Sequence, residues 1–297
     1  MDKLRSIEAF ICAVESGNFS EAARRLDITA VMVGKHVRQL ETALNTRLLQ
    51  RNTRRQHLTE AGERYYQQCK QALVLLREAD ESVENMKQTP SGLLRISAPL
   101  NLGASAIATV VTGYQLRYPQ VKIALDLNDR FVDLIAEGFD FAIRIGGLKH
   151  NEPLVAQFLG EYQMVVCAAP DYLAQHGTPQ TPGDLHRHRC LANMAWNKNN
   201  AWQWGDVTWP FDNSFTCNDG QALRQAALAG AGLILQPRIL LAQDIAAGRL
   251  VPLLQQWQPA SRPINLLWRQ DLSPSEKRSS FVRWMREQVP AALVVND

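Results

Sequence analysis

The sequence predicts a small helical domain, one long connecting helix and a larger two-lobed α/β domain within its 297 residues. Three observations predict this order. Apolar residues recur at helical spacing before residue 45, a helical pattern runs from Glu60 to about Gln88, and strands alternate with helices after residue 92. A chain of this length is expected to contain two or more hydrophobic cores.

Three short helices are predicted at the amino terminus. The first ends near Gly17, the second has Ser20 as its N-cap, and the third has Thr29 as its N-cap. On the third helix the inward stripe is Met32, Val33, Val37 and Leu40, and the opposite face is Ala30, Val31, Gly34, Lys35 and Arg38. Two short helices joined by a tight turn, the second with one apolar face and one small or cationic face, are typical of a helix-turn-helix with its recognition helix.

Positive charge is concentrated in and after this helix pair. The whole chain has a net charge of +3, whereas residues 35–57 contain one acidic residue, Glu41, against Lys35, Arg38, Arg47, Arg51, Arg54 and Arg55. Such local density favours phosphate binding, because each neutralised phosphate releases counterions; a solvated basic face is the alternative. Residues 44–49 and 54–58 are short enough to form a two-stranded wing whose arginines follow the sugar-phosphate edge.

Double-stranded DNA is therefore the expected partner of the first 58 residues. Lys35 and Arg38 can reach guanine acceptors or phosphates, and Ala30 and Val31 can touch thymine methyl groups. For Gly34, a close approach of the helix backbone to DNA and a packing role are both open. The residues expected to form the DNA interface are Ser20, Thr29, Ala30, Val31, Gly34, Lys35, Arg38, Arg51, Arg54 and Arg55.

The long helix, residues 59–88 with Thr59 as its N-cap, carries a heptad seam. Its apolar positions alternate steps of four and three residues: Tyr65, Cys69, Ala72, Leu76, Ala79, Val83 and Met86. Because such a seam needs a second helix to cover it, we expect a homodimer interface here, with packing inside the same subunit as the alternative. A two-fold dimer also suits a two-fold DNA site.

The alternation of strands and helices after residue 92 predicts parallel sheet covered by helices on both faces. Strands are expected at 93–98, 121–127, 139–145, 164–168, 233–235 and 264–268, and helices at 102–116 and 131–137, from 219, from 237 and at 274–288. The last strand and helix are expected to return to the first sheet, which gives two lobes joined by two crossovers. The expected domains are residues 1–58 (winged helix-turn-helix), 59–88 (linker and dimerisation helix) and 92–297 (lobe I at 92–162 and 267–297, lobe II at 163–266).

A ligand cleft is expected between the lobes, because ligands of α/β sheets bind at the carboxyl ends of the strands. Helix starts near Asn101 and Gly220 offer N–H groups, and Arg130 can fork a carboxylate, so a small anionic metabolite is expected. Arg144 either reaches this cleft or pairs with an acidic neighbour. The expected effector-binding residues are Leu100, Asn101, Arg130, Arg144, Gly146, Gly147, Met194, Trp196, Asn218, Asp219 and Gly220.

The sequence contains no motif that indicates an enzyme or a metal-binding protein. The run His186-Arg187-His188-Arg189-Cys190 is interpreted as a surface helix end rather than a metal site, because its arginines would repel a cation. No nucleophile elbow, P-loop or dinucleotide fingerprint occurs, so no enzyme, catalytic residue, metal or cofactor is expected. The five cysteines are scattered, and no export signal or membrane-spanning apolar run is found, so a cytoplasmic protein with reduced thiols is expected.

The ordered stretches Phe10–Ala23, Lys35–Glu41 and Leu58–Gly62 closely resemble the amino-terminal signature of LysR-type transcriptional regulators. Gly34 and Asp27 depart from that family, which often has serine and glycine at these positions. The later stretches Gly92–Ile96, Arg117–Pro119 and Ala229–Gly232 resemble the family's effector domain, so the resemblance covers almost the whole chain.

This resemblance implies a winged helix-turn-helix, a dimerising linker helix and a periplasmic-binding-protein-like effector domain, assembled as a tetramer. It implies a sequence-specific transcriptional regulator controlled by a small molecule between the lobes, with DNA, the effector, further copies of the chain and RNA polymerase as partners. The rival hypothesis is a two-lobed small-molecule binding protein or enzyme without a DNA target. Salt-sensitive binding to the protein's own promoter region would distinguish the two.

Overall fold

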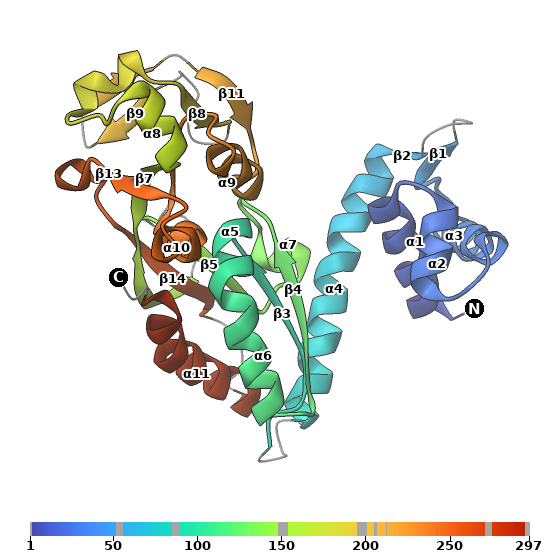
Figure 1. The fold of residues 1–297 in the computed structure, drawn as a ribbon. Helices are drawn as coiled ribbons and strands as arrows, with labels where there is room; N and C mark the ends of the chain where they lie inside the picture. Colours follow the sequence, from blue (N-terminus) through green and yellow to red (C-terminus); the bar gives the residue numbers. More distant parts are fainter. Residues whose placement is uncertain are drawn as a thin grey trace. The chain divides into compact units, whose positions relative to one another are not determined.

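The computed structural model describes residues 2–51, 56–84, 89–147, 154–194, 201–204, 207–211, 213–270 and 275–294 (Figure 1). The chain separates into two compact units, residues 1–84 with 133–138 and residues 85–132 with 139–297. Among the described residues, no helix combines the length and apolar character needed to cross a membrane.

The amino-terminal unit begins with three short helices, α1 (Lys3–Ser16), α2 (Phe19–Leu26) and α3 (Ala30–Leu44). Thr29 Oγ1 accepts a hydrogen bond from the Met32 amide at 3.3 Å, which confirms it as the N-cap of α3. The prediction that Ser20 caps α2 is wrong. Asn18 has extended backbone and accepts a hydrogen bond from the Glu21 amide at 2.8 Å, so α2 starts earlier and Ser20 lies inside its first turn.

The three helices share a small apolar core. Phe10 and Leu40 are buried in one part of it, and Ala22 and Val33 in another. Met32 was expected on the inward stripe of α3, but its side chain is 41% exposed. The buried stripe of α3 is therefore narrower than the sequence pattern indicated.

A two-stranded antiparallel wing follows, formed by β1 (Leu49–Arg51) and β2 (Gln56–Leu58). Glu41 of α3 holds the start of the wing, because one of its carboxylate oxygens accepts hydrogen bonds from the amides of Leu48 and Leu49 at 2.9 and 3.1 Å. The first wing strand was expected at residues 44–49 but begins later, since α3 continues through Leu44 and ends at Asn45 in the left-handed conformation.

Helix α4 (Glu60–Glu84) starts as predicted, with Thr59 Oγ1 accepting a hydrogen bond from the Gly62 amide at 2.9 Å. Tyr65 and Cys69 were expected to face a second subunit, but they pack into the core of their own unit, where the rings of Tyr65 and Phe10 lie 6.0 Å apart. A heptad pattern does not show whether the apolar seam packs against the same subunit or against a second one. The next seam residues are exposed: Ala72, Leu76 and Ala79. The side chain of Val83 and all of Met86 lie outside the described part of the chain.

The second unit contains two five-stranded sheets (Figure 1). The first has the order β4-β3-β5-β14-β6 and consists of β3 (Gly92–Ala98), β4 (Val121–Leu127), β5 (Phe141–Ile145), β6 (Leu154–Tyr162) and β14 (Arg262–Arg269). Strands β4, β3 and β5 are parallel, and β14 is antiparallel to β5 and β6. The late strand thus returns to the first sheet as predicted. The expected lobe boundary at residue 267 falls inside β14, because this strand pairs with β6 from Arg262 onward.

Helices cover this first sheet. The segment after β3 consists of α5 (Leu100–Leu102), a π-helical turn (Gly103–Ile107) and α6 (Ala108–Arg117), and the closing helix is α11 (Glu276–Leu293). Tyr114 of α6 donates a hydrogen bond to the Lys277 carbonyl of α11 at 3.1 Å, and both helices contribute to the buried core of this lobe. The short helix α7 (Leu134–Glu137) falls within residues 133–138 of the other unit.

The second sheet has the order β11-β8-β12-β7-β13. Its strands are β7 (Met164–Ala168), β8 (Cys190–Asn193), β11 (Asn213–Cys217), β12 (Leu233–Pro237) and β13 (Val251–Leu253). Strands β11, β8 and β12 are parallel, whereas β7 is antiparallel to both of its neighbours.

Both faces of the second sheet are covered. Helices α9 (Gly220–Leu228) and α10 (Arg238–Ala246) pack on one face, and α8 (Pro170–His176) packs on the other with the hairpin of β9 (Ala201–Trp204) and β10 (Val207–Pro210). Trp202 of this hairpin is completely buried. Two segments join the sheets: Gln163 between β6 and β7, and residues 254–261, with a 3₁₀ turn at Gln255–Trp257, between β13 and β14.

Candidate nucleic-acid interface and ligand cleft

The exposed face of α3 carries a stripe of side chains that can reach a ligand. Val31 is 75% exposed, and Lys35, Arg38 and Thr42 are exposed at successive turns of the same helix. The Arg38 Nε donates a hydrogen bond to the Gly34 carbonyl at 3.1 Å, which holds the stem of this side chain along the helix while the charged end stays accessible. Lys35 and Arg38, the two cations predicted for the recognition surface, are therefore both exposed on this face of α3.

Gly34 does not belong to that surface. It is buried, and a Cβ atom added at this position would lie 3.4 Å from Phe19 Cε2. Of the two interpretations left open by the sequence, this burial favours packing against Phe19, although a distance of 3.4 Å is an ordinary van der Waals contact that alanine would also allow. Ala30 is only half-buried, so its methyl group retains some access to a partner.

A hollow of about 500 Å³ continues from the exposed face of α3 toward the wing. Arg38 and Thr42 line it from the helix, and Arg47 lines it from the turn before β1. Glu41 also lines it, but its carboxylate is occupied by the Leu48 and Leu49 amides. The sequence analysis counted Arg47 among the local cations but did not predict it as a DNA-binding residue. Its position in the sequence, between the recognition helix and the wing, is the signal that could have predicted it.

The other predicted DNA contacts lie around this face. Ser20 and Thr29 are exposed near the starts of α2 and α3. Arg51 ends β1, although its side chain is outside the described part, and Arg54 and Arg55 are entirely outside it.

In the second unit, the predicted cleft residues follow the carboxyl ends of parallel strands. Leu100 and Asn101 follow β3, Arg130 follows β4, and Gly146 and Gly147 follow β5 in the first lobe. In the second lobe Met194, 60% exposed, follows β8, whereas Asn218, Asp219 and Gly220 follow β11. Trp196 lies outside the described residues.

The two groups of strand ends meet at Asn101 and Gly220. A Cβ atom added at Gly220 would lie 2.5 Å from Asn101 Nδ2 and 2.8 Å from its Oδ1. Asn101 is only 6% exposed, and no hydrogen bond joins its side-chain amide to another described residue. A side-chain amide can both donate and accept hydrogen bonds, so this position between the lobes favours a polar ligand.

The helix starts at this edge are not open anion sites as the sequence suggested. The Leu100 amide donates to Asp129 Oδ1 at 3.1 Å, and the Ala222 amide donates to Asp219 Oδ1 at 2.7 Å. Each helix start is thus already compensated by a carboxylate, which side-chain caps commonly provide. Any preference for an anion must come from the arginines instead.

Arg144 joins the ends of the three parallel strands. Its guanidinium donates to Ser97 Oγ at 2.9 Å, to the Arg130 carbonyl at 3.3 Å and to the Ile143 carbonyl at 2.6 Å. Asn128 donates to the same Ser97 hydroxyl at 3.4 Å, and its Oδ1 is buried without a partner in the described part. Ser97 and Asn128 were not predicted as site residues, although polar residues at strand ends were the available signal.

Gly146 supports this edge from the backbone. Its φ is 96°, and an added Cβ atom would lie 2.5 Å from Arg262 Nη2. The positive φ favours glycine at this position, whereas the flexible end of Arg262 could shift to make room for a side chain. Its neighbour Gly147 is exposed.

The side chains of the run His186–Cys190 lie in different environments. His186 is exposed, His188 is buried beside the Tyr172 hydroxyl at 3.3 Å, and Cys190 lies inside β8, where burial raises the pKa of its thiol to about 12. No group of three His, Cys, Asp or Glu side chains within the described ranges is arranged to hold a metal ion.

Comparisons with known proteins agree with this arrangement. The LysR substrate binding domain matches residues 87–290, and the bacterial regulatory helix-turn-helix protein, lysR family, matches residues 4–63. An uncharacterised HTH-type transcriptional regulator of Haemophilus influenzae is 35% identical, covering 90% of this chain and 94% of that protein. An HTH-type transcriptional repressor of Pseudomonas aeruginosa is 31% identical, covering 97% and 92%.

A solved structure extends the likeness to the fold. The full-length Vibrio cholerae virulence activator AphB is 28% identical, with a TM-score of 0.69 over 97% of this chain and 98% of that chain. The likeness therefore includes the helix-turn-helix, the linker helix and both lobes.

Proposed function

This chain belongs to the LysR family of transcriptional regulators, and from that premise we propose that a small polar metabolite with an acidic group binds at Asn101 and controls operator binding through α3. The family consists of transcription regulators rather than enzymes. The observation that carries the proposal is the position of Asn101: this residue is 6% exposed, its side-chain amide makes no hydrogen bond to a described residue, and it touches Gly220 of the opposite lobe.

For DNA, we propose that α3 enters the major groove with Val31, Lys35 and Arg38 toward the bases. Arg47 and the wing arginines then hold phosphates on either side. Support comes from the exposure of these side chains at successive turns and from the hollow that Arg38 and Arg47 share. We also propose a cytoplasmic location, because DNA is the proposed target.

For the effector, we propose that donors from Asn101 and the Arg130 and Arg144 region receive an acidic group between the lobes. An arginine that can present two N–H groups recognises a carboxylate better than a neutral group. Since the helix starts are already compensated by Asp129 and Asp219, the preference for an anion rests on the guanidinium groups. A sensor must also release its ligand, so we expect a dissociation constant of roughly micromolar to millimolar.

For assembly, we propose a dimer through the exposed stripe Ala72, Leu76 and Ala79 of α4. Two dimers then form a tetramer at the promoter, where RNA polymerase is a further partner. Ligand binding would change the spacing of the DNA-binding units, so operator affinity and ligand affinity would be reciprocally coupled.

The test is a titration of the full-length protein against the DNA upstream of its own gene at several salt concentrations. We expect specific binding whose affinity falls steeply with salt. Calorimetry against carboxylates, amino acids and uncharged analogues then identifies the ligand class, with Asn101→Leu as the variant. Absence of salt-sensitive specific binding would favour the rival two-lobed binding protein, and exclusive binding of neutral or cationic compounds would contradict the acidic effector.

A further inference from the structure

Arg47 lies on a short segment between α3 and β1, and hydrogen bonds hold the backbone of this segment from two sides. On the side of α3, Glu41 Oε1 accepts hydrogen bonds from the amides of Leu48 and Leu49 at 2.9 and 3.1 Å. On the side of α4, Thr59 Oγ1 donates a hydrogen bond to the Arg47 carbonyl at 2.8 Å, and the Thr59 amide donates one to the Leu48 carbonyl at 3.0 Å. The segment is therefore anchored to the recognition helix and to the start of the linker helix.

The side chains of this segment divide between the core and the surface. Leu48 and Leu49 are 1% and 5% exposed and belong to the core that also contains Leu40 of α3. Arg47 is exposed and lines the hollow of about 500 Å³ beside α3. The segment also lies directly on α4, because a Cβ atom added at Gly62 would be only 2.0 Å from the Leu48 carbonyl oxygen. The backbone position of Arg47 is thus set by the residues that follow it.

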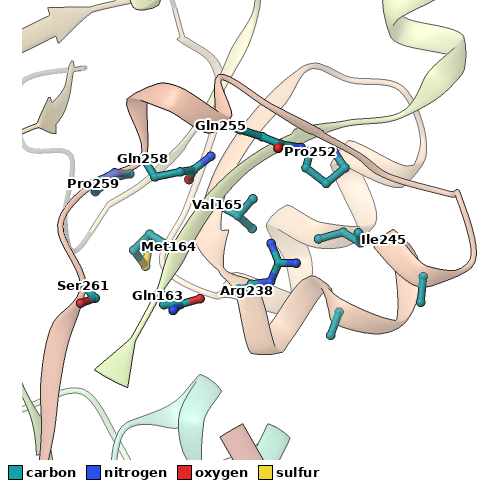
Figure 2. Close-up of a pocket in the computed structure, with 12 residues that line it drawn as sticks. Gln163, Met164, Val165, Arg238, Ile245, Pro252, Gln255, Gln258, Pro259 and Ser261 are labelled. Atoms are coloured by element: carbon teal, nitrogen blue, oxygen red, sulfur yellow. The ribbon is translucent and has the colours of Figure 1, made fainter. Parts of the chain in front are cut away.

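Glu41 is the one acidic residue among the described residues that line this hollow. The pocket at the segments that join the two sheets of the second unit differs in this respect: Arg238 is the one charged side chain among its described lining residues (Figure 2). In the described part of the chain, the Glu41 carboxylate makes no ion pair with Arg38 or Arg47 and is bonded to the two amides instead. A carboxylate beside DNA repels phosphates, so charge alone predicts that its removal strengthens DNA binding.

We propose that Glu41 is a positioning residue for DNA binding, whose carboxylate fixes the segment from which Arg47 reaches a DNA phosphate at the hollow. The inference rests on the proposed DNA interface and adds the residue that keeps this part of it in place. Without Glu41 the two amides lose their acceptor next to the buried leucine side chains, and the segment shifts toward water that can replace it. An arginine on an anchored backbone loses less conformational freedom when it binds a phosphate, so the anchor raises the affinity without touching DNA.

DNA binding by the full-length protein tests the sign of this effect. The probe is the DNA upstream of its own gene, titrated by fluorescence anisotropy at several salt concentrations. We expect Glu41→Ala to weaken binding by about tenfold although it removes a negative charge, and to lower the slope of log affinity against log salt by about one for each Arg47 that loses its phosphate. Glu41→Gln keeps an oxygen that can accept from both amides, so it should bind no more than about twofold more weakly than the wild type. Glu8→Ala removes the same charge from an exposed position of α1 and is the control.

A double-mutant cycle shows whether Glu41 acts through Arg47. Arg47→Ala should weaken binding about as much as Glu41→Ala, and adding Glu41→Ala to Arg47→Ala should change the affinity less than about twofold. A general loss of folding would instead weaken binding further in the Arg47→Ala background. Hydrogen exchange measures the anchor directly: in Glu41→Ala the amides of residues 45–49 should exchange faster, whereas those of the buried residues 9–13 of α1 should keep their wild-type rates.

Three results would overturn the proposal: an unchanged or higher DNA affinity in Glu41→Ala, a loss of affinity in Glu41→Gln as large as in Glu41→Ala, or losses from Glu41→Ala and Arg47→Ala that add in full. Failure of the wild-type protein to bind DNA in a salt-sensitive way would contradict the proposed function itself. The two failures are distinguishable, because the second appears before any variant is compared.

Discussion

Asn101 and Gly220 occupy one point of contact between the two lobes: the amide of Asn101 lies where any side chain at Gly220 would begin, 2.5 Å from the ideal Cβ position. Asn101 follows the first strand of one sheet, and Gly220 starts the helix after β11 of the other. The backbone at Gly220 does not require glycine for its conformation. Its small size is required by the neighbouring amide.

Gly220→Ala should therefore separate the lobes locally. Real Cβ atoms do not approach neighbours at 2.5 Å, so Asn101 must move or α9 must withdraw. We expect faster hydrogen exchange at the amides of residues 100–102 and 220–222. Gly183→Ala, whose new methyl group would lie 3.4 Å from Thr181 Oγ1, is the matched control and should leave these amides unchanged. Equal exchange in both variants would show that Asn101 rearranges without opening the contact.

Lys35→Ala and Arg38→Ala should each weaken specific operator binding while leaving the fold intact, because both side chains are exposed on α3. A lost base contact costs about 1–3 kcal/mol and relaxes the sequence preference at one position of the site. A lost phosphate contact instead weakens binding to all sequences by a similar amount and makes the affinity less dependent on salt. Fluorescence anisotropy at several salt concentrations separates these effects. Lys122→Ala removes an exposed cation from β4 and is the control. Unchanged affinity in both α3 variants would exclude this face as the recognition surface.

Local signals in the sequence predicted much of the fold. The ranges 121–127 and 164–168 coincide with β4 and β7, and Thr59 caps α4, because strand periodicity and capping depend on neighbouring residues. By contrast, among the described strands β6 pairs only with the distant β14, and it contains Gly160 at a φ of 151°, so its sequence carries a weak strand pattern. Long-range pairing, rather than local preference, creates this strand.

The candidate sites were less predictable from the sequence than the fold. Strand order alone placed Asn101 and Gly220 at carboxyl ends, but their contact depends on how two separate sheets face one another. Asp219 directly precedes the helix that it caps. Asp129, in contrast, could not be recognised as the carboxylate at the start of α5 without coordinates, because it lies 29 residues away in the sequence. Similarly, the helical period that includes Tyr65 does not distinguish packing within a unit from dimerisation.

Leu76→Glu should dissociate the proposed dimer. Leu76 is 50% exposed on α4 beyond the part of the helix that packs into its own core, and a charge there would be buried against the partner helix. Gln68→Glu adds the same charge at an exposed position outside the seam and should leave the assembly unchanged. Analytical ultracentrifugation measures the oligomer. A dimer that persists in Leu76→Glu would mean that α4 does not use this stripe for assembly.

Asp244→Asn should destabilise the effector unit and remove part of its acid sensitivity. Asp244 is completely buried in α10; its Oδ1 accepts hydrogen bonds from Arg224 Nη2 at 3.0 Å and from Arg249 Nη2 at 2.6 Å. Burial raises the pKa of this carboxyl group, but the hydrogen bonds and charges of the two arginines outweigh burial and leave the pKa below its usual value. Breaking such a buried pair costs about 3–5 kcal/mol.

The sign of the pH effect follows from this lowered pKa. The unfolded chain binds the proton first, near the usual Asp pKa of about 3.9, so the stabilisation is complete above that pH and is lost as the pH falls through the lower pKa of the folded state. All seven tryptophans lie after residue 195, so tryptophan fluorescence during urea unfolding reports on this unit. We expect Asp244→Asn to lower the free energy of unfolding at pH 7 and to show a smaller further loss at pH 3.5 than the wild type. Asp171→Asn, at an exposed position of α8, is the control, and equal pH dependence in Asp244→Asn and the wild type would remove Asp244 as a source of acid sensitivity.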